Sequence, residues 1–262
     1  MFEWDPQDYA ANSSTQQVWA RELLDRACLQ GDEQVLDVGC GDGRISAQLA
    51  ALVPRGRVLG IDLSDEMIRF ARKRHPVALH PNLAFRALDA RQLALPTGFD
   101  LVFSNAALHW VDDHPAFLRG VATALNPGGR LLVSCGGRGN AADVFAIVRS
   151  TMRRRAWREF FREMRPPYFF HDTVDYERWL PAVGLEPALL RLAERESLHA
   201  GREGFAGWFR TSWLPYTQRI PADRRDAFID DVTDRFLELH PPDAAGRVRV
   251  RMVRLELDAH RL

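Results

Sequence analysis

The sequence predicts an α/β fold in which a doubly wound, mostly parallel sheet is covered by helices on both faces. Apolar, strand-like runs alternate with helical patterns along the first half of the chain, which is typical of parallel strands joined by right-handed crossovers. The first run, Val35–Val38, leads directly into glycines at alternate positions, beginning with Gly39 and Gly41. The second, Arg57–Ile61, ends at Asp62. An acid in this place, about 20 residues after a glycine-rich turn, marks the ligand-binding edge of such sheets.

Each element is predicted from its own pattern. Apolar residues at helical spacing predict an amphipathic helix within residues 1–30, and Ser64 is suited to cap the helix that follows the second strand. Apolar and charged residues alternate over 248–258, which predicts a half-buried strand with an irregularity near Val253. The other expected elements are strands at 83–88, from 99, after 129 and at 185–198, and helical segments at 141–172, 176–180, 202–213 and 221–239.

The composition bounds the class of protein. With 262 residues the chain is long enough for one α/β domain with a modest insertion. Its 35 basic and 35 acidic side chains balance, so no net field favours nucleic acid or an anionic membrane. Three cysteines without paired spacing indicate a reducing compartment, and no apolar run reaches the roughly 18 residues of a membrane span. The start of the chain does not read as a signal peptide, so we expect a soluble cytoplasmic protein.

The glycine turn predicts a nucleoside ligand that has no phosphates. Alternate glycines let the backbone turn sharply and approach a ligand closely, and the following helix directs its first N–H groups toward electron-rich atoms. The spacing from Asp37 onward is D-x-G-x-G-x-G, whereas the dinucleotide fingerprint is G-x-G-x-x-G. A nicotinamide-dependent dehydrogenase is therefore disfavoured.

Three later blocks follow in an order that is specific to one family. Leu83–Ala90 is a third strand that ends in an acid, Phe99–Trp110 is a fourth strand with its loop, and Leu125–Val133 carries an L-x-P-G-G turn into a fifth. With these blocks the chain resembles the class I S-adenosylmethionine-dependent methyltransferases over roughly residues 9–135. The resemblance implies a Rossmann-like sheet of seven strands, the last inserted antiparallel between strands five and six. It also implies S-adenosyl-L-methionine as cofactor and S-adenosyl-L-homocysteine as product.

The resemblance assigns roles around the cofactor. Asp62 would accept both ribose hydroxyls while Leu63 packs on adenine, and Asp89 would accept from the adenine amino group while the Ala90 N–H donates to a ring nitrogen. The glycine loop would approach the methionine portion, with Asn105 beneath it. The expected cofactor-binding residues in this part of the chain are Asp37, Gly39, Gly41, Asp62, Leu63, Asp89, Ala90 and Asn105.

The N-terminal segment supports a narrower resemblance. Tyr9, Asn12, Gln16 and Trp19 follow the spacing of the lid helix in a subgroup that contains trans-aconitate, juvenile hormone acid and malonyl-carrier-protein methyltransferases. In that subgroup the helix closes over the methionine end of the cofactor, so Tyr9 and Gln16 are expected contacts. The stretch 108–113 and the pattern from 208 to 216 fit the same subgroup.

The chain is expected to divide into a cofactor-binding core and a helical cap. The predicted parts are a lid helix at 1–30, a Rossmann-like core at 31–137, cap segments at 138–172 and 199–242, and the rest of the sheet at 173–198 and 243–262. A cap near the carboxyl ends of the strands would cover the substrate. Its aromatic residues favour a partly apolar acceptor, and Arg210 is suited to bind a carboxylate. The expected substrate-binding residues are His109, Trp110, Tyr168, Trp208, Arg210, Trp213 and Tyr216.

The expected reaction is methylation of a small molecule, with carboxylate O-methylation by in-line displacement as the leading hypothesis. The sulfonium is a good leaving group and a carboxylate is ionised at neutral pH, so neither a general acid nor a general base is required. A hydroxyl or carbon acceptor would require a base, and His109 is then the first candidate for this catalytic role. The partner would be a carboxylic acid or a partly apolar metabolite, and the chain a monomer or weak dimer.

Other functions are alternatives to this hypothesis. The stretch from Ser104 to Trp110 also resembles respiratory complex I assembly factors, which keep this fold and act on a protein partner without methylating. Nucleic-acid methylation is disfavoured because the loop reads Ser104-Asn105-Ala106-Ala107 and lacks an N-P-P-Y-like motif. The histidines lack metal-ligand spacing with each other or with cysteine, so no metal site is predicted.

Overall fold

The computed structural model describes residues 14–262, with side chains from Trp19 onward, and divides into two compact units. The core unit comprises Gln16–Arg138, Tyr168–Ala193 and Arg254–Leu262. The helical unit comprises Gly139–Pro167 and Glu194–Val253. Strands β6 and β7 begin in one unit and end in the other.

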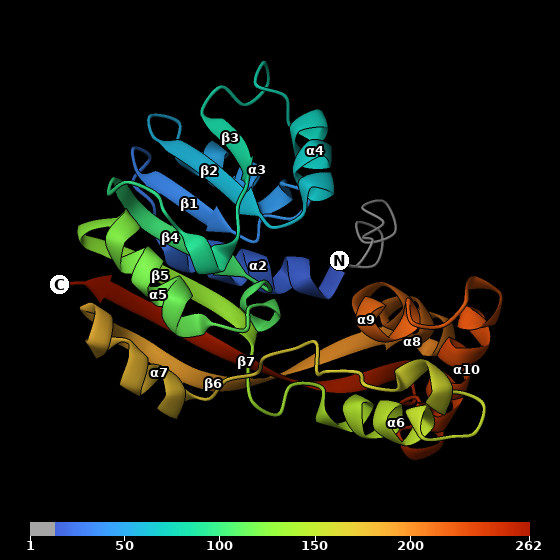
Figure 1. The fold of residues 1–262 in the computed structure, drawn as a ribbon. Coiled ribbons are helices and arrows are strands. Elements are labelled where there is room, and N and C mark those ends of the chain that lie inside the picture. The colour runs from blue at the N-terminus through green and yellow to red at the C-terminus, as the bar shows by residue number, and fades with distance from the viewer. Residues whose placement is uncertain (1–13) are drawn as a thin grey trace. The chain divides into compact units, whose positions relative to one another are not determined.

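The core unit is built on a seven-stranded sheet in the order β3-β2-β1-β4-β5-β7-β6 (Figure 1). The pairs β1–β2, β2–β3, β1–β4 and β4–β5 are parallel, and β5–β7 is antiparallel. The predicted doubly wound sheet, including the inserted last strand, is therefore confirmed. The strands are β1 (Gln34–Val38), β2 (Arg57–Asp62), β3 (Leu83–Ala87), β4 (Phe99–Asn105), β5 (Leu125–Gly136), β6 (Leu185–Ala200) and β7 (Arg247–Arg261).

Two hydrophobic cores flank the sheet because successive strand residues point to opposite faces. Val35, for example, packs in the core that includes side chains of α2, α3 and α4, whereas Leu36 packs in the core that includes α5 and Tyr176 of α7. The helices of this unit are α2 (Ser14–Ala27), α3 (Arg44–Leu52), α4 (Asp65–Arg74), α5 (His114–Ala124) and α7 (Thr173–Trp179). Short 3-10 turns lie at Ala90–Gln92, Leu108–Trp110 and Pro181–Val183.

The sheet reverses direction of winding between β1 and β4, which are neighbours although β2 and β3 intervene in the chain. Ligands of open α/β sheets bind outside the carboxyl ends of the strands at this switch point. The carboxyl ends of β1, β2 and β4 are Val38, Asp62 and Asn105. The topology thus brings Asp62, Asn105 and the glycine loop that follows Val38 to one edge of the core unit.

Helix α4 begins where the sequence predicts. The Ser64 side chain accepts a hydrogen bond from the Met67 N–H at 3.2 Å, which satisfies one of the free donors of the first turn. Asp65 and Glu66 lie in the first turn and Arg72, Lys73 and Arg74 in the last, an arrangement that complements the helix dipole.

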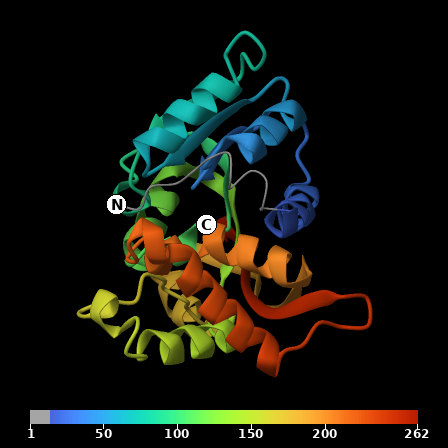
Figure 2. The same ribbon diagram turned by 90° about the vertical axis from the view of Figure 1, so that its right-hand side faces the viewer.

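The helical unit contains α6 (Ala142–Met152), α8 (Gly201–Ser212), α9 (Leu214–Thr217) and α10 (Ala222–Leu239), and a 3-10 turn at Arg158–Phe161. Helix α10 contacts α6, α8 and α9, and Figure 2 shows these helices gathered together. Its core is aromatic: the Phe205 and Phe236 rings stack at 4.6 Å, and Trp157 donates from its indole N–H to Asp231 at 2.7 Å.

Two details of the predicted elements are wrong. Within the predicted helical segment 141–172, residues 153–157 and 162–172 are not helical. Pro166 and Pro167 cannot donate to a helix and restrict the residues before them. Strand β7 is also unbroken at Val253. The strand passes from one compact unit to the other at this position, because residues up to Val253 belong to the helical unit and Arg254 begins the last segment of the core unit.

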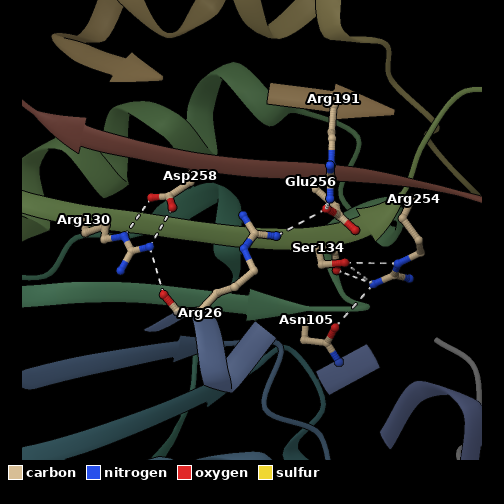
Figure 3. Close-up of polar contacts among 8 residues, drawn as sticks. All are labelled: Arg26, Asn105, Arg130, Ser134, Arg191, Arg254, Glu256 and Asp258. Carbon is tan, nitrogen blue, oxygen red and sulfur yellow. Dashed lines mark hydrogen bonds and ion pairs between the residues drawn. The ribbon is translucent and has the colours of Figure 1, made fainter. Parts of the chain in front are cut away.

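The charged residues that end β7 are buried, although the alternating pattern predicts an exposed face. The exposed fractions are 4% for Arg254, 4% for Glu256 and 9% for Asp258. Each of these side chains has polar partners (Figure 3). Arg191 and Arg26 donate to Glu256 at 2.8 and 3.3 Å. This strand is covered on both sides by its neighbours β5 and β6 and on its faces by packing, so charges survive there only when paired.

A second pair ties β5 and β7 to the end of α2. The Arg130 guanidinium binds both carboxylate oxygens of Asp258 at 2.7 and 2.6 Å. It also donates to the carbonyls of Ala27 and Arg26, both at 3.0 Å, which satisfies acceptors left free at the end of the helix.

Candidate functional site

The glycine loop is pressed against the loop that follows β4. The Gly39 and Cys40 N–H groups both donate to the Ile61 carbonyl, at 2.8 and 2.9 Å, which fixes the loop to β2. Gly39 has a φ of 76°, and a Cβ placed on it would lie 2.1 Å from the Cβ of Ala107. A side chain at this position is therefore excluded by packing as well as by backbone conformation.

Gly41 has a different environment from Gly39. Its φ is 53°, and a Cβ placed on it would meet no atom within 4 Å. Its N–H donates to Asp62 Oδ2 at 3.0 Å, so the loop is held in place with the Cα of Gly41 facing open space. This open backbone surface at Gly41, called the glycine cradle below, allows the close approach of a small ligand.

Asp62 joins the glycine loop to α4. Oδ2 accepts from Gly41 and Oδ1 accepts from the Ser64 N–H at 2.9 Å. A carboxylate has four lone pairs, so with the N–H groups of Gly41, Ser64 and Leu63 directed at it Asp62 keeps capacity for a further donor such as a hydroxyl. Burial raises the pKa of Asp62 despite these hydrogen bonds. The neighbouring Leu63 side chain is 55% exposed, which gives the site an apolar surface of the kind that an adenine ring covers.

Asp37 lies beneath the loop and is 2% exposed. Ser46 of α3 donates to its Oδ2 at 2.6 Å. Burial raises the pKa of Asp37 to about 7, with the negative charge of Asp62 adding to the effect. In the described residues Asp37 therefore anchors α3 to β1, and its predicted contact with the cofactor stays a prediction.

Asp89 and Ala90 form a turn after β3, at the start of a short 3-10 helix. Asp89 accepts from the Arg91 N–H at 2.9 Å and is paired with the Arg91 guanidinium at 2.6 Å, which lowers the pKa of the carboxyl. Arg91 also reaches Asp112 at 3.1 Å. No sequence pattern indicates Arg91 as a site residue apart from its position two residues after Asp89, an expected adenine contact.

The turn Leu108–Trp110 is held from three sides. His114 Nε2 lies 2.9 Å from the Leu108 carbonyl, the Phe169 N–H donates to the His109 carbonyl at 2.9 Å, and the Gly136 N–H donates to His109 Nδ1 at 3.3 Å. Trp110 packs on Tyr168, with ring centroids 4.6 Å apart. The structure thus brings His109, Trp110 and Tyr168 together.

The contact with Gly136 defines the state of the His109 ring. A backbone N–H can only donate, so Nδ1 carries the lone pair and Nε2 carries the proton of the neutral ring. Burial of the ring, aided by the positive charge of Arg254, lowers the pKa of His109 to about 3. His109 is therefore neutral near pH 7 and presents a donor at Nε2.

His114 links the turn at Leu108 to Tyr176 of α7. It is 1% exposed, and its Nδ1 lies 2.7 Å from the hydroxyl of the fully buried Tyr176. Since the Leu108 carbonyl can only accept, Nε2 carries the proton and Nδ1 accepts from Tyr176. The sequence gives no local signal for this role of His114, because its partners lie on separate elements.

We expect His114 to make stability depend on pH. Burial lowers the pKa of His114 from 6.5 to about 4, so the unfolded chain binds more protons between these values. Its contribution is therefore present above pH 6.5 and is lost as the pH falls toward 4, by about 3 kcal/mol. Urea unfolding at pH 7.5 and 5 should show a shallower pH dependence for His114→Gln than for the wild type. The exposed His260→Gln variant is the control, and equal slopes for all three proteins would contradict this role.

Asn105 contacts a residue that the sequence analysis missed. Arg254 donates to Asn105 Oδ1 at 3.3 Å, to the Ser134 carbonyl at 2.6 Å and to Ser134 Oγ at 2.9 Å (Figure 3). Its guanidinium also lies over the Trp19 ring, 5.0 Å from the centroid. No local sequence signal identifies this contact, since Asn105 and Arg254 are 149 positions apart.

The remaining predicted site residues lie elsewhere. Tyr9 is outside the described residues, and Gln16 lies on α2 with its side chain outside them. Trp208, Trp213 and Tyr216 are buried together in the helical unit, where Trp213 lies 6.0 Å from Trp208 and 5.5 Å from Tyr216 between ring centroids. Arg210 is exposed on α8. Because they belong to the other unit, a pocket shared with His109 stays a prediction.

Over residues 14–262 the structure offers no group of three or more His, Cys, Asp or Glu side chains that could hold a metal ion. In the same part of the chain, no helix combines the length and apolar character needed to cross a membrane.

The sheet order, the glycine cradle and the acid at the end of β2 define a class I S-adenosylmethionine-dependent methyltransferase. A family model described as a methyltransferase domain matches residues 29–173. The chain belongs to this methyltransferase family, and S-adenosylmethionine is its cofactor.

Comparisons with individual proteins agree with this assignment. Trans-aconitate 2-methyltransferase from Methylobacterium nodulans is 30% identical to this chain. The match covers 100% of this chain and 99% of that protein. The YcgJ protein from Bacillus subtilis has a TM-score of 0.62 at 16% identity, over 92% of this chain and 97% of that one. Geranyl diphosphate C-methyltransferase from Streptomyces coelicolor, solved with S-adenosylhomocysteine, has a TM-score of 0.55 at 16% identity, over 94% and 81%. The two structures support the fold alone.

Proposed function

We propose that this enzyme transfers the methyl group of S-adenosylmethionine to a carboxylate oxygen of a small molecule. The observation that carries the proposal is the state of His109. Its accepting nitrogen is engaged by the Gly136 N–H, its pKa is about 3, and the nitrogen left for a substrate is a donor. Such a ring suits an acceptor that is already ionised and is unsuited to remove a proton. The trans-aconitate 2-methyltransferase relatives point to the same class of acceptor.

The cofactor would be held by the edge of the core unit. When bound, it supplies a methyl group on a sulfonium, which leaves as a neutral thioether. In this proposal Asp62 accepts from the ribose hydroxyls, Leu63 covers adenine, and Asp89 and the Ala90 N–H bind the adenine edge. The loop at Gly39 and Gly41, above Asp37, cradles the methionine portion next to Asn105. Tyr9 and Gln16 would close over it.

The acceptor would lie beside the turn at His109. Trp110 and Tyr168 offer an aromatic wall there, and His109 Nε2–H would donate to one carboxylate oxygen while the other attacks the methyl group. The rate would then come from proximity, in-line orientation and exclusion of water, because no proton needs to move. We extend the proposal to Trp208, Arg210, Trp213 and Tyr216 of the helical unit as further acceptor contacts, with Arg210 as the cationic one.

Several broader features belong to the same proposal. The partner would be a carboxylic acid or partly apolar metabolite, with no role for nucleic acid or a membrane. The protein would act in the cytoplasm as a monomer or weak dimer, with the helical unit as the cap that selects the acceptor.

The test is methyl transfer from methyl-labelled S-adenosylmethionine to a panel of small carboxylic acids, followed by mild base. Label released as volatile methanol supports a carboxyl ester and identifies the acceptor class. Label kept in a base-stable product would contradict the proposal and favour a carbon or hydroxyl acceptor. Absence of transfer to any member of a broad panel would favour a relative that acts on a protein partner without methylating.

We expect His109 to act as a donor in this reaction. His109→Gln, which keeps an N–H donor, should retain most activity, whereas His109→Phe should raise KM for the acid about tenfold through loss of one hydrogen bond to a charged group. Because the pKa of His109 is about 3, kcat/KM should show no inflection from this group between pH 5 and 8. An acidic limb near pH 6.5 in the wild type that disappears in His109→Gln would show that His109 acts as a base.

A further inference from the structure

Arg254 connects the last strand of the sheet to the end of β4. It lies opposite Gly136 in the antiparallel β5–β7 ladder, and its side chain reaches Ser134 and then Asn105. The residue is 4% exposed, and its guanidinium lies over the Trp19 ring of α2. Figure 3 shows the guanidinium directed toward the Asn105 amide from the side of β7. Two strands and a helix thus hold its position.

This contact determines the orientation of an amide that could otherwise turn either way. A guanidinium contains only donors, so the Asn105 atom that faces it must be the oxygen. The Asn105 nitrogen consequently lies on the side away from Arg254 (Figure 3). Asn105 therefore offers its free side two N–H donors, while its oxygen is engaged by Arg254.

The position of Asn105 places these donors beside the glycine loop. Asn105 is the last residue of β4, which pairs with β1 through Asp37 and Phe103. Two residues further on, Ala107 approaches Gly39 so closely that an added Cβ would lie 2.1 Å away. Asn105 thus begins the segment that packs on Gly39 through Ala107 and continues to His109, whose Nε2 is also a donor. The buried positive charge of Arg254 makes this part of the site favourable for an anion.

We propose that Arg254 is a positioning residue that fixes Asn105 as a hydrogen-bond donor to a carboxylate at the methionine end of the cofactor. The inference rests on the proposed cofactor site and adds that Asn105 presents hydrogen-bond donors to it. The same chemistry would suit the carboxylate of the acceptor, so the test separates these two sources.

The test exchanges donors for acceptors at Asn105. Asn105→Asp keeps the size of the side chain and gains an ion pair with Arg254, so thermal unfolding of the ligand-free protein should be unchanged or shifted upward. It presents only acceptors to the ligand, however. Calorimetry with S-adenosylhomocysteine should show affinity lowered about tenfold or more. Decarboxylated S-adenosylhomocysteine, the same thioether without its carboxyl group, should bind this variant as well as it binds the wild type.

Two further variants make the test specific. Arg254→Lys keeps the charge but loses the planar fork, so it should lower S-adenosylhomocysteine affinity less than Asn105→Asp and leave the decarboxylated compound unaffected. Arg191→Gln removes another guanidinium of the same polar cluster, one that binds Glu256 and not Asn105. This control should bind both compounds like the wild type.

The outcomes separate the inference from the function on which it rests. A wild type that binds neither compound would overturn the proposed cofactor site and the inference together. The inference alone would be overturned by a different result. In that result the wild type binds both compounds, Asn105→Asp has the same ratio of the two affinities as the wild type, and its KM for the acid is unchanged. An unchanged ratio with a raised KM for the acid would overturn the assignment to the cofactor and show that Asn105 donates to the carboxylate of the acceptor.

Discussion

Gly39→Ala is expected to destabilise the fold severely. The new methyl group would lie 2.1 Å from the Ala107 Cβ, and the φ of 76° is itself unfavourable for alanine. The loop cannot move aside without losing the donation from the Gly39 and Cys40 N–H groups to Ile61. Overpacking together with backbone strain should lower the free energy of unfolding by about 3 kcal/mol or more, measured by urea unfolding. The same variant should not bind S-adenosylhomocysteine.

Gly41→Ala is the matched control for this prediction. Its φ is 53°, but its Cβ would point into open space, so only backbone strain of about 1 kcal/mol is expected. The protein should fold, and the methyl group should instead obstruct the cradle and lower S-adenosylhomocysteine affinity about tenfold or more. Equal losses of stability in the two variants would contradict the steric argument. Wild-type affinity in Gly41→Ala would show that the ligand does not approach this part of the loop.

Asp62→Asn is expected to lower cofactor affinity strongly. Both carboxylate oxygens accept from backbone N–H groups, those of Gly41 and Ser64. The single amide oxygen of asparagine can accept from only one of these N–H groups, and the amide nitrogen would face the other N–H group. The variant would therefore lose one hydrogen bond that holds the backbone and one acceptor for the ribose. We expect S-adenosylhomocysteine affinity to fall about a hundredfold, or about 3 kcal/mol, by calorimetry at pH 7.5.

The control for Asp62→Asn is Asp65→Asn, an exposed acid in the first turn of α4. It removes the same charge three residues away without contacting the loop, and should leave affinity within about threefold, the range of an exposed electrostatic effect. If Asp62→Asn also stayed within that range, the ribose role would be wrong.

The sequence predicts those parts of the site that depend on consecutive residues. A strand, a glycine turn and a helix cap are local signals, which is why Gly39, Asp62 and Ser64 lie where they were expected. The donor character of Asn105 and His109 has no such signal. It depends on Arg254 and on the Gly136 N–H, which fold from distant segments to contact them.

The burial of Arg254 could nevertheless have been predicted by combining two expectations. The family resemblance implies that the last strand is inserted within the sheet, whereas its alternating charges taken alone favour a half-exposed face. An inserted strand is covered more completely than an edge strand, so its charged residues must be paired. The conflict between topology and pattern was itself the signal for a buried polar cluster.

The division of the chain has a consequence for how this enzyme can diversify. The helical unit enters the sequence as two insertions, Gly139–Pro167 and Glu194–Val253, and neither contains a residue of the glycine loop or the strand ends that carry Asp62 and Asn105. Mutations and even whole-segment exchanges in these insertions can therefore be inherited without altering the cofactor-binding residues of the core unit. Under the proposed function, in which the helical unit selects the acceptor, a lineage built on this chain would acquire new acceptors while its methyl-donor chemistry stays constant.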